Sequence, residues 1–536
     1  MPIDRSTTDS SAGVRNASGT NQVAPQGAKK PKLLARRRLK ESDVNVVDQP
    51  MLKKALGGTI VGNTMEWYDV GVFGYLITTM GPVFLPEADK TVQNLFLLGT
   101  FGATFVARPL GGVFFGWLGD KIGRQRVLAM TLIIMAASTF VVGLLPGYAV
   151  LGIWAAVLLV ATKLIQGFST GGEYAGATTF VSEHAPDARR GYFASFLDLG
   201  SYMGFAIGAA LVTLLQVTLG GDAMEAWGWR LPFLIAGPLG LIAIYFRMKI
   251  EESPAFQASL DAQAAGTPAG EAAETKGPVA IFASHWRGIL LAMILVAAAN
   301  TVGYALTSYM PTYLTSNKGY DELHGTLLTI PILVLMSAAI PLTGRLSDRI
   351  GRRPVLWIGS LGTVVLAAPA FLLIGIGAIW STLLGLALIA FPLTFYVANL
   401  ASALPALFPT ESRYGAMGIA YNFAVAIFGG TAPFIIASLI AASGNEMMPA
   451  YYLMATSAIG AVAVYFITET AGKPLRGSMP SVDTIEEAHE LVAGQDSNEN
   501  LDLNQMPFDH TYEPAEGQEP PAGAAGAAEG KDRPAD

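Results

Sequence analysis

Two carboxylic acids stand three residues apart inside an apolar stretch of the sequence. Glu66 and Asp69 belong to the string GNTMEWYD at 62–69, and a spacing of three places them on one face of a helix. Two carboxylates that are close together in a medium of low dielectric constant repel each other when both are ionised, so one of them readily holds a proton. The pair is therefore a candidate for proton uptake and release.

The first half of the chain holds further ionisable residues within apolar stretches. They are Arg108, Lys163, Glu173 and Asp198, whereas the corresponding stretches of the second half offer amides such as Asn399 and Asn422. Each charge costs about 2.5–3.5 kcal/mol at the centre of a membrane helix, which makes each one a functional candidate. If a proton is carried, Glu66, Asp69, Glu173 and Asp198 are the expected carriers. The alternative is that the acids are permanently paired with Arg108 and Lys163 and only link helices.

A polar stripe follows one of these stretches. Lys163, Gln166, Thr170 and Glu173 are separated by steps of three and four residues, which places them on one slowly drifting helical face. Gly171 and Gly172 interrupt the stripe, so the helix can pass close to a neighbour or unwind beside a ligand. The stripe is expected to face a cavity.

Aromatic residues are candidates for the other part of a binding site. Trp67, Tyr68 and Tyr304 are the preferred candidates, because aromatic faces attract ammonium groups and a nearby Arg or Lys can bind a carboxylate. Together they suit a zwitterion. The alternative for each ring is ordinary packing or a place at the membrane interface. The full expected substrate-binding set is Trp67, Tyr68, Arg108, Lys163, Gln166, Tyr304, Asn399 and Asn422.

The elements that must position these residues are membrane helices. Apolar residues make up 52% of the 536 positions, charged residues 14%, and the mean hydropathy is +0.43, which is too apolar for a soluble chain of this length. Twelve apolar runs approach the roughly 20 residues that a bilayer requires. They lie near 55–80, 93–118, 127–147, 149–182, 191–219, 230–248, 287–315, 325–346, 354–376, 379–407, 414–440 and 447–468. Lys and Arg concentrate in alternate loops, which by the positive-inside rule places these loops and both termini in the cytoplasm.

One loop motif occurs twice between apolar runs. Its first copy contains Gly116, Asp120 and Arg124, and its second copy, 228 residues later, contains Gly344, Asp348 and Arg352. The glycines allow a tight turn, the aspartate can cap or pair with a neighbouring helix end, and the arginines hold the turn at the membrane surface. The repeat indicates two homologous halves, and the two aspartates are expected to latch the inner face.

The expected organisation has five parts. A polar and basic tail covers 1–50, a six-helix bundle 51–250, a central loop 251–286, a second six-helix bundle 287–470, and an acidic, mostly disordered tail 471–536, in which 483–493 could form a short helix. Seven cations in 29–40 could bind anionic lipid, although a role in topology alone would also explain them. No cleaved signal peptide is visible.

Other classes of function are not expected. The chain has no cysteine, five scattered histidines and no phosphate-binding Gly-x4-Gly-Lys motif. We therefore expect no metal, no cofactor, no nucleic-acid partner and no enzymatic activity.

Several long motifs resemble one known family. GNTMEWYDVGVFGY (62–75), RPLGGVFFGWLGDKIGRQR (108–126), QGFSTGGEYAGATTFVSEHAP (166–186) and LPALFPTESRYGAMGIAYN (404–422) are similar to the metabolite:proton symporter family of the major facilitator superfamily, in particular to its compatible-solute transporters. The resemblance covers about residues 50–476. It implies an all-α integral membrane protein with 12 transmembrane helices in two pseudo-symmetric six-helix bundles.

The resemblance also implies a function. The protein would import proline, glycine betaine and related zwitterionic osmolytes with protons across a bacterial inner membrane, and hyperosmotic stress would activate it. The acidic tail lacks the sustained heptads of a coiled coil that ends some relatives. Two alternatives stay open: a proton symporter for an organic anion such as shikimate or 2-oxoglutarate, and a receptor for osmotic stress or nutrients that does not transport.

Overall fold

The structure is a computed structural model that describes residues 36–122, 124–171, 173–248, 278–506 and 511–512. The chain divides into two compact units, residues 1–38 with 509–536, and residues 39–508. In the first unit, β1 (Arg36–Arg37) pairs antiparallel with β4 (Thr511–Tyr512). Everything described below belongs to the second unit.

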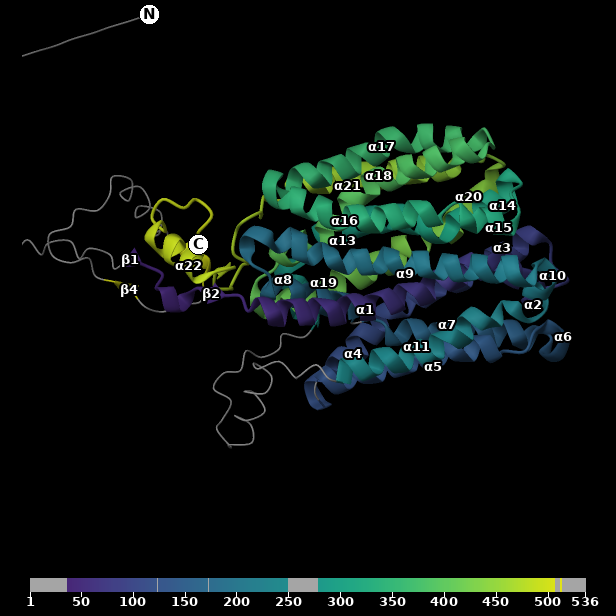
Figure 1. Ribbon diagram of the computed structural model, residues 1–536, viewed down its shortest axis with the longest axis horizontal. Coiled ribbons are helices and arrows are strands. Elements are labelled where there is room, and N and C mark those ends of the chain that lie inside the picture. The colour runs from purple at the N-terminus through teal and green to yellow at the C-terminus, as the bar shows by residue number, and fades with distance from the viewer. Residues whose placement is uncertain (1–35, 123, 172, 249–277, 507–510, 513–536) are drawn as a thin grey trace, which may run out of the picture. The chain divides into compact units, whose positions relative to one another are not determined.

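The first half of the second unit is a bundle of helices (Figure 1). Its helices are α1 (Gln49–Tyr75), α2 (Ile77–Phe84), α3 (Lys90–Val106), α4 (Arg108–Ile122), α5 (Arg124–Leu144), α6 (Tyr148–Leu151), α7 (Ile153–Ser169), α8 (Glu173–His184), α9 (Arg190–Leu219), α10 (Gly221–Ala223) and α11 (Arg230–Met248), with the short turns η2 (Asp187–Arg189) and η3 (Met224–Gly228). Two expected spans are broken in the middle, one between α3 and α4 and one between α7 and α8. Helix α1 packs along α9, and α5 packs along α11.

The second half repeats this arrangement. It comprises α13 (Pro278–Tyr304), η4 (Ala305–Tyr309), α14 (Met310–Lys318), α15 (Glu322–Leu327), α16 (Ile330–Ile350), α17 (Arg352–Gly375), α18 (Ile379–Ala403), η5 (Pro405–Leu407), α19 (Thr410–Ala424), η6 (Val425–Gly429), α20 (Ala432–Ser443) and α21 (Met448–Phe466). The turns η3, η4 and η6 are π-helical. In this bundle α17 packs against α18 and α21, and α13 against α19.

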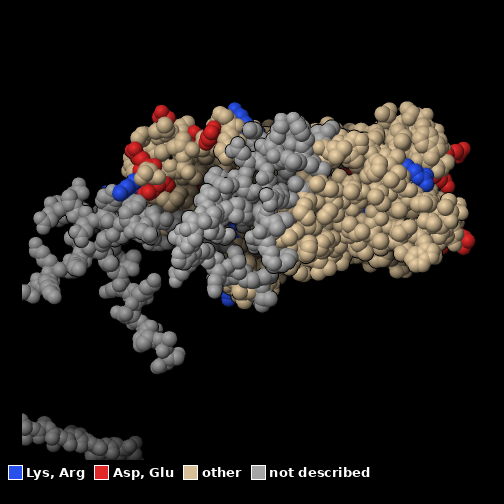
Figure 2. Space-filling view, turned by 90° about the horizontal axis from the view of Figure 1, so that it is seen from below, with Lys and Arg blue, Asp and Glu red and all other residues tan. Residues whose placement is uncertain are grey.

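The described helices agree with the expected membrane spans. Within the described residues, nine helices are long and apolar enough to cross a membrane, and Met130–Leu144 and Arg230–Leu241 are shorter apolar helices. Helix α1, which carries the two carboxylates, extends over 27 residues. Figure 2 shows the matching surface: on this face the described charged residues lie toward the ends of the helical body and the band between them has none. The architecture is all-α, as expected from the sequence.

The two bundles touch through α9 and α16, which lie side by side (Figure 1). A β-carbon on Gly344 would lie 2.6 Å from the carbonyl oxygen of Gly191 and 2.6 Å from the hydroxyl of Ser195. Only glycine leaves room for this approach. Gly344 therefore brings the end of α16 into backbone contact with the start of α9.

A small folded cap lies at one end of the bundles. Strand β2 (Asn45–Val46) pairs in parallel with β3 (Ser481–Val482), next to η1 (Glu41–Asp43), α22 (Ile485–Ala493) and η7 (Leu503–Gln505). Val44, Val482 and Ala488 form its apolar centre, and the Thr484 hydroxyl accepts a hydrogen bond from the Glu487 N–H at 3.2 Å. We call residues 39–48 and 467–506 the cap, and the end of the bundles where it lies the cap end.

The cap corrects one expectation from the sequence. The tail 471–536 was expected to be mostly disordered, but residues 471–506 are folded. Too few apolar residues lie in this segment to form a core by themselves, and they find partners in the segment before α1. Helix α22 falls within the expected helix 483–493. The basic run up to residue 35 and the end of the acidic tail lie outside the described residues, as does most of the central loop.

Candidate functional site

A buried ion pair lies at the break between α3 and α4. The Arg108 guanidinium is 3.0 Å from the Glu66 carboxylate of α1, and their side chains are 2% and 1% exposed. The guanidinium also lies over two rings, 4.6 Å from the centre of Phe105 and 5.9 Å from that of Trp67. Because α4 begins at Arg108, the charge is held at the junction of two helices inside the helical body.

The second bundle contributes one aromatic residue to the surroundings of this ion pair, which we call the Glu66–Arg108 centre. Tyr304 of α13 lies 4.9 Å from Phe105 and 5.9 Å from both Trp67 and Phe101, measured between ring centres. The Tyr304 hydroxyl and the Arg108 Nε are buried and have no hydrogen-bond partner among the described residues. Burying an unpaired donor costs about 1–3 kcal/mol. Two donors thus lie free beside an aromatic wall at the junction of the bundles.

Asp69 lies in different surroundings from Glu66. Its carboxylate accepts hydrogen bonds from the Thr139 hydroxyl of α5, at 2.7 Å, and from the Gln166 amide of α7. Lys163 of α7 lies 4.5 Å from the centre of the Phe73 ring and interacts electrostatically with Asp69. The two carboxylates therefore share a helix but have different partners, since Glu66 pairs with α4 and Asp69 accepts hydrogen bonds from α5 and α7.

The residues around Trp67 divide between the centre and the packing. The Tyr68 hydroxyl donates to the Pro232 carbonyl of α11 at 2.9 Å, so Tyr68 faces the first bundle, on the other side of α1 from the ligand position that we expected. Trp67 Nε1 donates to Asn63 at 3.1 Å, and Asn63 in turn donates to Ser201 of α9 at 2.6 Å. Sequence reasoning did not select Asn63, although its spacing of four from Trp67 could have identified it.

Toward the cap end, a second layer crosses the bundle interface. The rings of Tyr174 (α8) and Tyr421 (α19) are stacked, with their centres 4.2 Å apart and their planes at 15°. The Tyr174 hydroxyl lies 3.3 Å from both oxygens of Asp198, and Asn422 donates to the Gly171 carbonyl at the break between α7 and α8. Glu173 is buried at the start of α8. The aromatic pair was not selected from the sequence, because no spacing connects residues in different halves.

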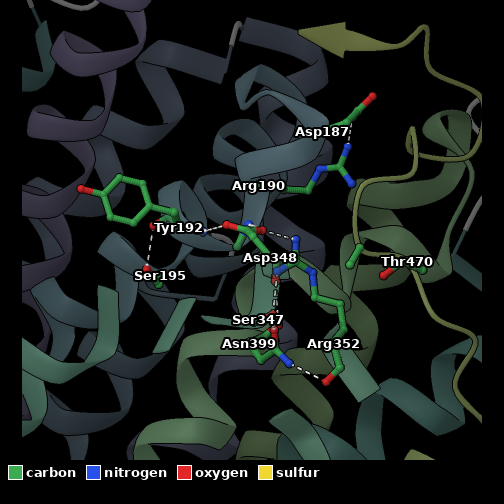
Figure 3. A network of polar contacts seen from close by, with 12 residues as sticks. Asp187, Arg190, Tyr192, Ser195, Ser347, Asp348, Arg352, Asn399 and Thr470 are labelled. Atoms are coloured by element: carbon green, nitrogen blue, oxygen red, sulfur yellow. Dashed lines mark hydrogen bonds and ion pairs between the residues drawn. The ribbon is translucent and has the colours of Figure 1, made fainter. Parts of the chain in front are cut away.

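The second copy of the repeated loop lies in a polar network at the cap end (Figure 3). The Asp348 carboxylate accepts backbone hydrogen bonds from Gly191 and Tyr192, both at 2.8 Å, at the first turn of α9. It also pairs with Arg352 at 2.7 Å. A carboxylate on the first N–H groups of a helix is favoured by their partial positive charge. One aspartate of the second bundle thus caps a helix of the first.

Asn399 belongs to this network. It accepts a hydrogen bond from the Ser347 hydroxyl and donates to the Arg352 carbonyl at 2.7 Å. We had expected it among the substrate-binding residues, and the structure places it in the support of the loop. Asn422, by contrast, lies close to the centre, since a β-carbon on Gly112 would be 3.4 Å from its amide. For Gly116, Asp120 and Arg124 of the first copy, the side chains lie outside the described part of the structure.

Contacts between the bundles occur on both sides of the centre. At the cap end, Glu183 and Arg413 lie 2.5 Å apart and the Ser182 hydroxyl donates to the Ala401 carbonyl at 2.9 Å. At the opposite end, the Thr79 hydroxyl donates to Glu322 at 2.8 Å and Asn94 to Ser316 at 2.9 Å. The Glu66–Arg108 centre therefore lies between two sets of interbundle contacts. The described residues include no group of three His, Cys, Asp or Glu that could hold a metal ion.

Comparisons with known proteins agree with this architecture. The profile of the family described as "Sugar (and other) transporter" matches residues 57–479. The ectoine/proline transporter of Corynebacterium glutamicum is 49% identical over 89% of this chain and 96% of its own length. The proline/betaine transporter of Escherichia coli K12 is 44% identical over 89% and 96%. A glycine betaine/proline/ectoine/pipecolic acid transporter of Dickeya dadantii is 45% identical over 88% and 94%.

Solved structures support the fold independently. A partially occluded, inward-open structure of the Escherichia coli xylose transporter covers 80% of this chain and 100% of its own, with 20% identity and a TM-score of 0.61. A major facilitator superfamily proton:xylose symporter bound to a sugar analogue gives the same TM-score with 19% identity, covering 81% of this chain and 98% of its own. At this level of identity the likeness concerns the fold alone.

Proposed function

Since this chain belongs to the sugar (and other) transporter family and has the major facilitator fold, we propose that it imports zwitterionic compatible solutes such as proline and glycine betaine by proton symport. The relatives named above are described as transporters of proline, together with ectoine, betaine or glycine betaine. The single observation that carries the proposal is the buried Glu66–Arg108 pair beneath Tyr304, at the junction of the two bundles.

The centre has the parts that a zwitterion requires. A substrate carboxylate pairs with the Arg108 guanidinium and accepts a hydrogen bond from the free hydroxyl of Tyr304. The ammonium end lies against the rings of Trp67 and Phe105, which attract cations even when these have no N–H to donate. Gln166 contacts Asp69 and Lys163 contacts Phe73. These two residues therefore support the site and do not bind the substrate directly.

Glu66 links the proton to the solute. While Glu66 is ionised it is paired with Arg108. A substrate carboxylate would then have to share the Arg108 cation with a second negative charge. Protonation of Glu66 removes its charge and leaves Arg108 free for the substrate. Proton and solute are therefore bound together, and their joint binding favours closure of the side from which they entered. Asp69 has two hydrogen-bond donors and a cation already, so we rank Glu66 first and retain Asp69, Glu173 and Asp198 as further candidates.

The cap end is the cytoplasmic end in this proposal. Both termini are then cytoplasmic, in a bacterial inner membrane, and we propose that the cations of 29–40 bind anionic lipid. Asp348 latches this end through α9 and Arg352, and Asp120 has the matching role in the first copy of the loop. Uptake rises under hyperosmotic conditions.

Transport by purified protein in liposomes tests the proposal. An inwardly directed proton gradient should drive accumulation of betaine and proline, and each should compete with the other. Glu66→Gln should abolish uphill accumulation and retain exchange of solute across the membrane, whereas Asp69→Asn should weaken both activities. Full uphill uptake in both variants would contradict proton coupling through α1. Competition by shikimate or 2-oxoglutarate, without competition by betaine, would instead establish an organic-anion symporter.

A further inference from the structure

The second layer of the interface, between the Glu66–Arg108 centre and the cap, has an arrangement that the binding step does not use. It consists of the stacked rings of Tyr174 and Tyr421, which come from different bundles, and of Asp198, which accepts from Tyr174. Both rings are buried, at 5% and 4% exposure. A ring pair contributed by two bundles can persist only while the bundles remain together at that level.

The layer lies one helical turn from the centre. A β-carbon on Gly112 would be 2.9 Å from the Gly171 carbonyl, which is the acceptor of the Asn422 hydrogen bond. Gly112 is four residues beyond Arg108 in α4, a rise of about 6 Å. On the other side, Tyr421 lies 11 residues from the first residue of α19, or about 16 Å from the cap end.

Asp198 fixes the orientation of the first-bundle ring. It lies eight residues into α9, about 12 Å from the cap end, and the Tyr174 hydroxyl spans both of its oxygens at 3.3 Å. Aromatic pairs contribute about 0.5–1.5 kcal/mol beyond the area that they bury. The layer is thus strong enough to hold a closed state and weak enough to be broken in each cycle.

We propose that the Tyr174–Tyr421 stack is the inner gate of the transport path, and that Asp198 is the residue that positions it. The stack closes the path on the cap side of bound solute, and its separation lets the solute leave toward the cap end. This inference rests on the proposed transport function. It assigns the inner closure to two rings near the centre, in addition to the Asp348 contacts at the surface.

The absence of native cysteine makes the proposal directly testable. Asn300→Cys places a thiol beside Gly429, on the far side of the stack from the cap, and Gly418→Cys places one on the cap side, where a β-carbon meets no atom within 4 Å. Each is combined with Tyr421→Ala, which removes the stack, or Tyr174→Phe, which keeps the ring and loses the contact with Asp198. Tyr396→Phe is the matched control, because Tyr396 is a buried tyrosine of α18 that is remote from the layer.

The readout is the labelling rate with a membrane-impermeant thiol reagent, added at the cap side of oriented vesicles. Tyr421→Ala should raise labelling of the Asn300→Cys thiol at least five-fold and Tyr174→Phe about two-fold. Tyr396→Phe should leave that rate unchanged, and the Gly418→Cys thiol should label equally in all backgrounds. An unchanged rate for the Asn300→Cys thiol in Tyr421→Ala would overturn the proposal. If Tyr421→Ala does not fold, Tyr174→Leu removes the stack from the other bundle, and failure of both to fold would also contradict a gate that must open without unfolding.

This experiment separates the gate from the proposed substrate. Labelling needs no solute, so a positive result with a chain that fails to transport betaine would retain the gate and reject the substrate. Betaine uptake with unchanged labelling of the Asn300→Cys thiol would retain the substrate and reject the gate. A labelling increase that betaine then suppresses would support both.

Discussion

The two bundles differ most at their centres and least at the cap end. At the centre the first bundle contributes Glu66 and Arg108, and the second contributes the uncharged side chain of Tyr304, with Tyr421 and Asn422 one helical turn away toward the cap end. The first bundle therefore carries the groups that can exchange a proton, and the second carries groups that can seal and orient. A division of this kind lets a single protonation event act on one half only.

At the cap end the two halves are alike. Arg190 Nε donates to the carbonyl eight residues earlier, that of Ser182, at 3.2 Å, and Arg413 Nε donates to the carbonyl eight residues earlier, that of Pro405, also at 3.2 Å. Each arginine also donates to a carbonyl of the cap, Arg190 to residue 473 at 3.0 Å and Arg413 to residue 476 at 2.8 Å. The repeated geometry is thus retained where the helices turn and has diverged where ligand chemistry occurs.

The largest effect is expected from breaking the charged centre of the first bundle. Arg108→Gln leaves Glu66 buried without its partner, which costs about 3–5 kcal/mol, so the variant should unfold at a lower temperature and should not transport. The double variant Glu66→Gln with Arg108→Gln removes both charges and should recover most of the thermal stability in detergent. It should still not transport. Substantial betaine uptake by the folded double variant would show that the pair is structural.

The next test concerns the uncharged contribution of the second bundle. Tyr304→Phe keeps the ring against Phe105 and removes only the hydroxyl, which has no partner among the described residues. A hydrogen bond to a charged group contributes about 1.5–3 kcal/mol, so KM for betaine should rise at least ten-fold with little loss of stability. Tyr396→Phe, in the same bundle but away from the centre, should leave KM unchanged. Equal changes of KM in Tyr304→Phe and Tyr396→Phe would contradict a binding role of the Tyr304 hydroxyl.

A smaller effect should follow from changing the aspartate of the loop motif that occurs in both halves of the sequence. Asp348→Asn removes the charge that pairs with Arg352 and caps α9, an interaction of about 1 kcal/mol at a helix start. The transport rate should change two- to five-fold while KM for solute stays within two-fold. Asp120→Asn provides the comparison in the first copy. Similar changes in both variants would extend the likeness of the two halves to function, and a KM effect of Asp348→Asn would place this loop in the binding site.

The sequence predicted the elements better than the contacts between them. Apolar runs, the repeated loop, the charged residues of the first half and the aromatic residues of the runs are local features, and they were sufficient to predict two bundles and to select Glu66, Arg108 and Tyr304. Whether a polar residue faces ligand or support depends on the rotation and tilt of helices, which a single helix does not determine. For that reason Tyr68 and Asn399 were expected at the ligand and lie in packing or loop contacts.

The folded cap was missed for a related physical reason. Residues 471–506 have too few apolar side chains to fold alone, and their partners are more than 400 residues away in the chain, in 39–48. Composition measures what a segment can bury by itself, so it predicted disorder. The prediction holds for a segment in isolation and fails where a distant segment completes the core.

The smallest expected effect is a pH-dependent one in the cap. Burial raises the pKa of the Glu469 carboxyl. The hydrogen bonds that it accepts from the backbone N–H groups of Arg352, Ala471, Arg353 and Thr470 lower this pKa by more than burial raises it, so the net pKa lies below the ordinary value of 4.5. Because the folded-state pKa is depressed, the stabilisation is complete above about pH 4.5 and is lost as the pH falls through the lower folded-state value.

Glu469→Gln should therefore lower the stability of the purified protein by about 1 kcal/mol at pH 7, and the difference from the parent should shrink as the pH falls below 4.5. Glu490→Gln, at an exposed position of α22, is the control and should match the parent throughout. The measurement is thermal unfolding in detergent across this pH range. Glu469 accepts hydrogen bonds from the first turn of α17, so a difference that persists unchanged at low pH would mean that its side chain stabilises this end of the second bundle through packing and not through its charge.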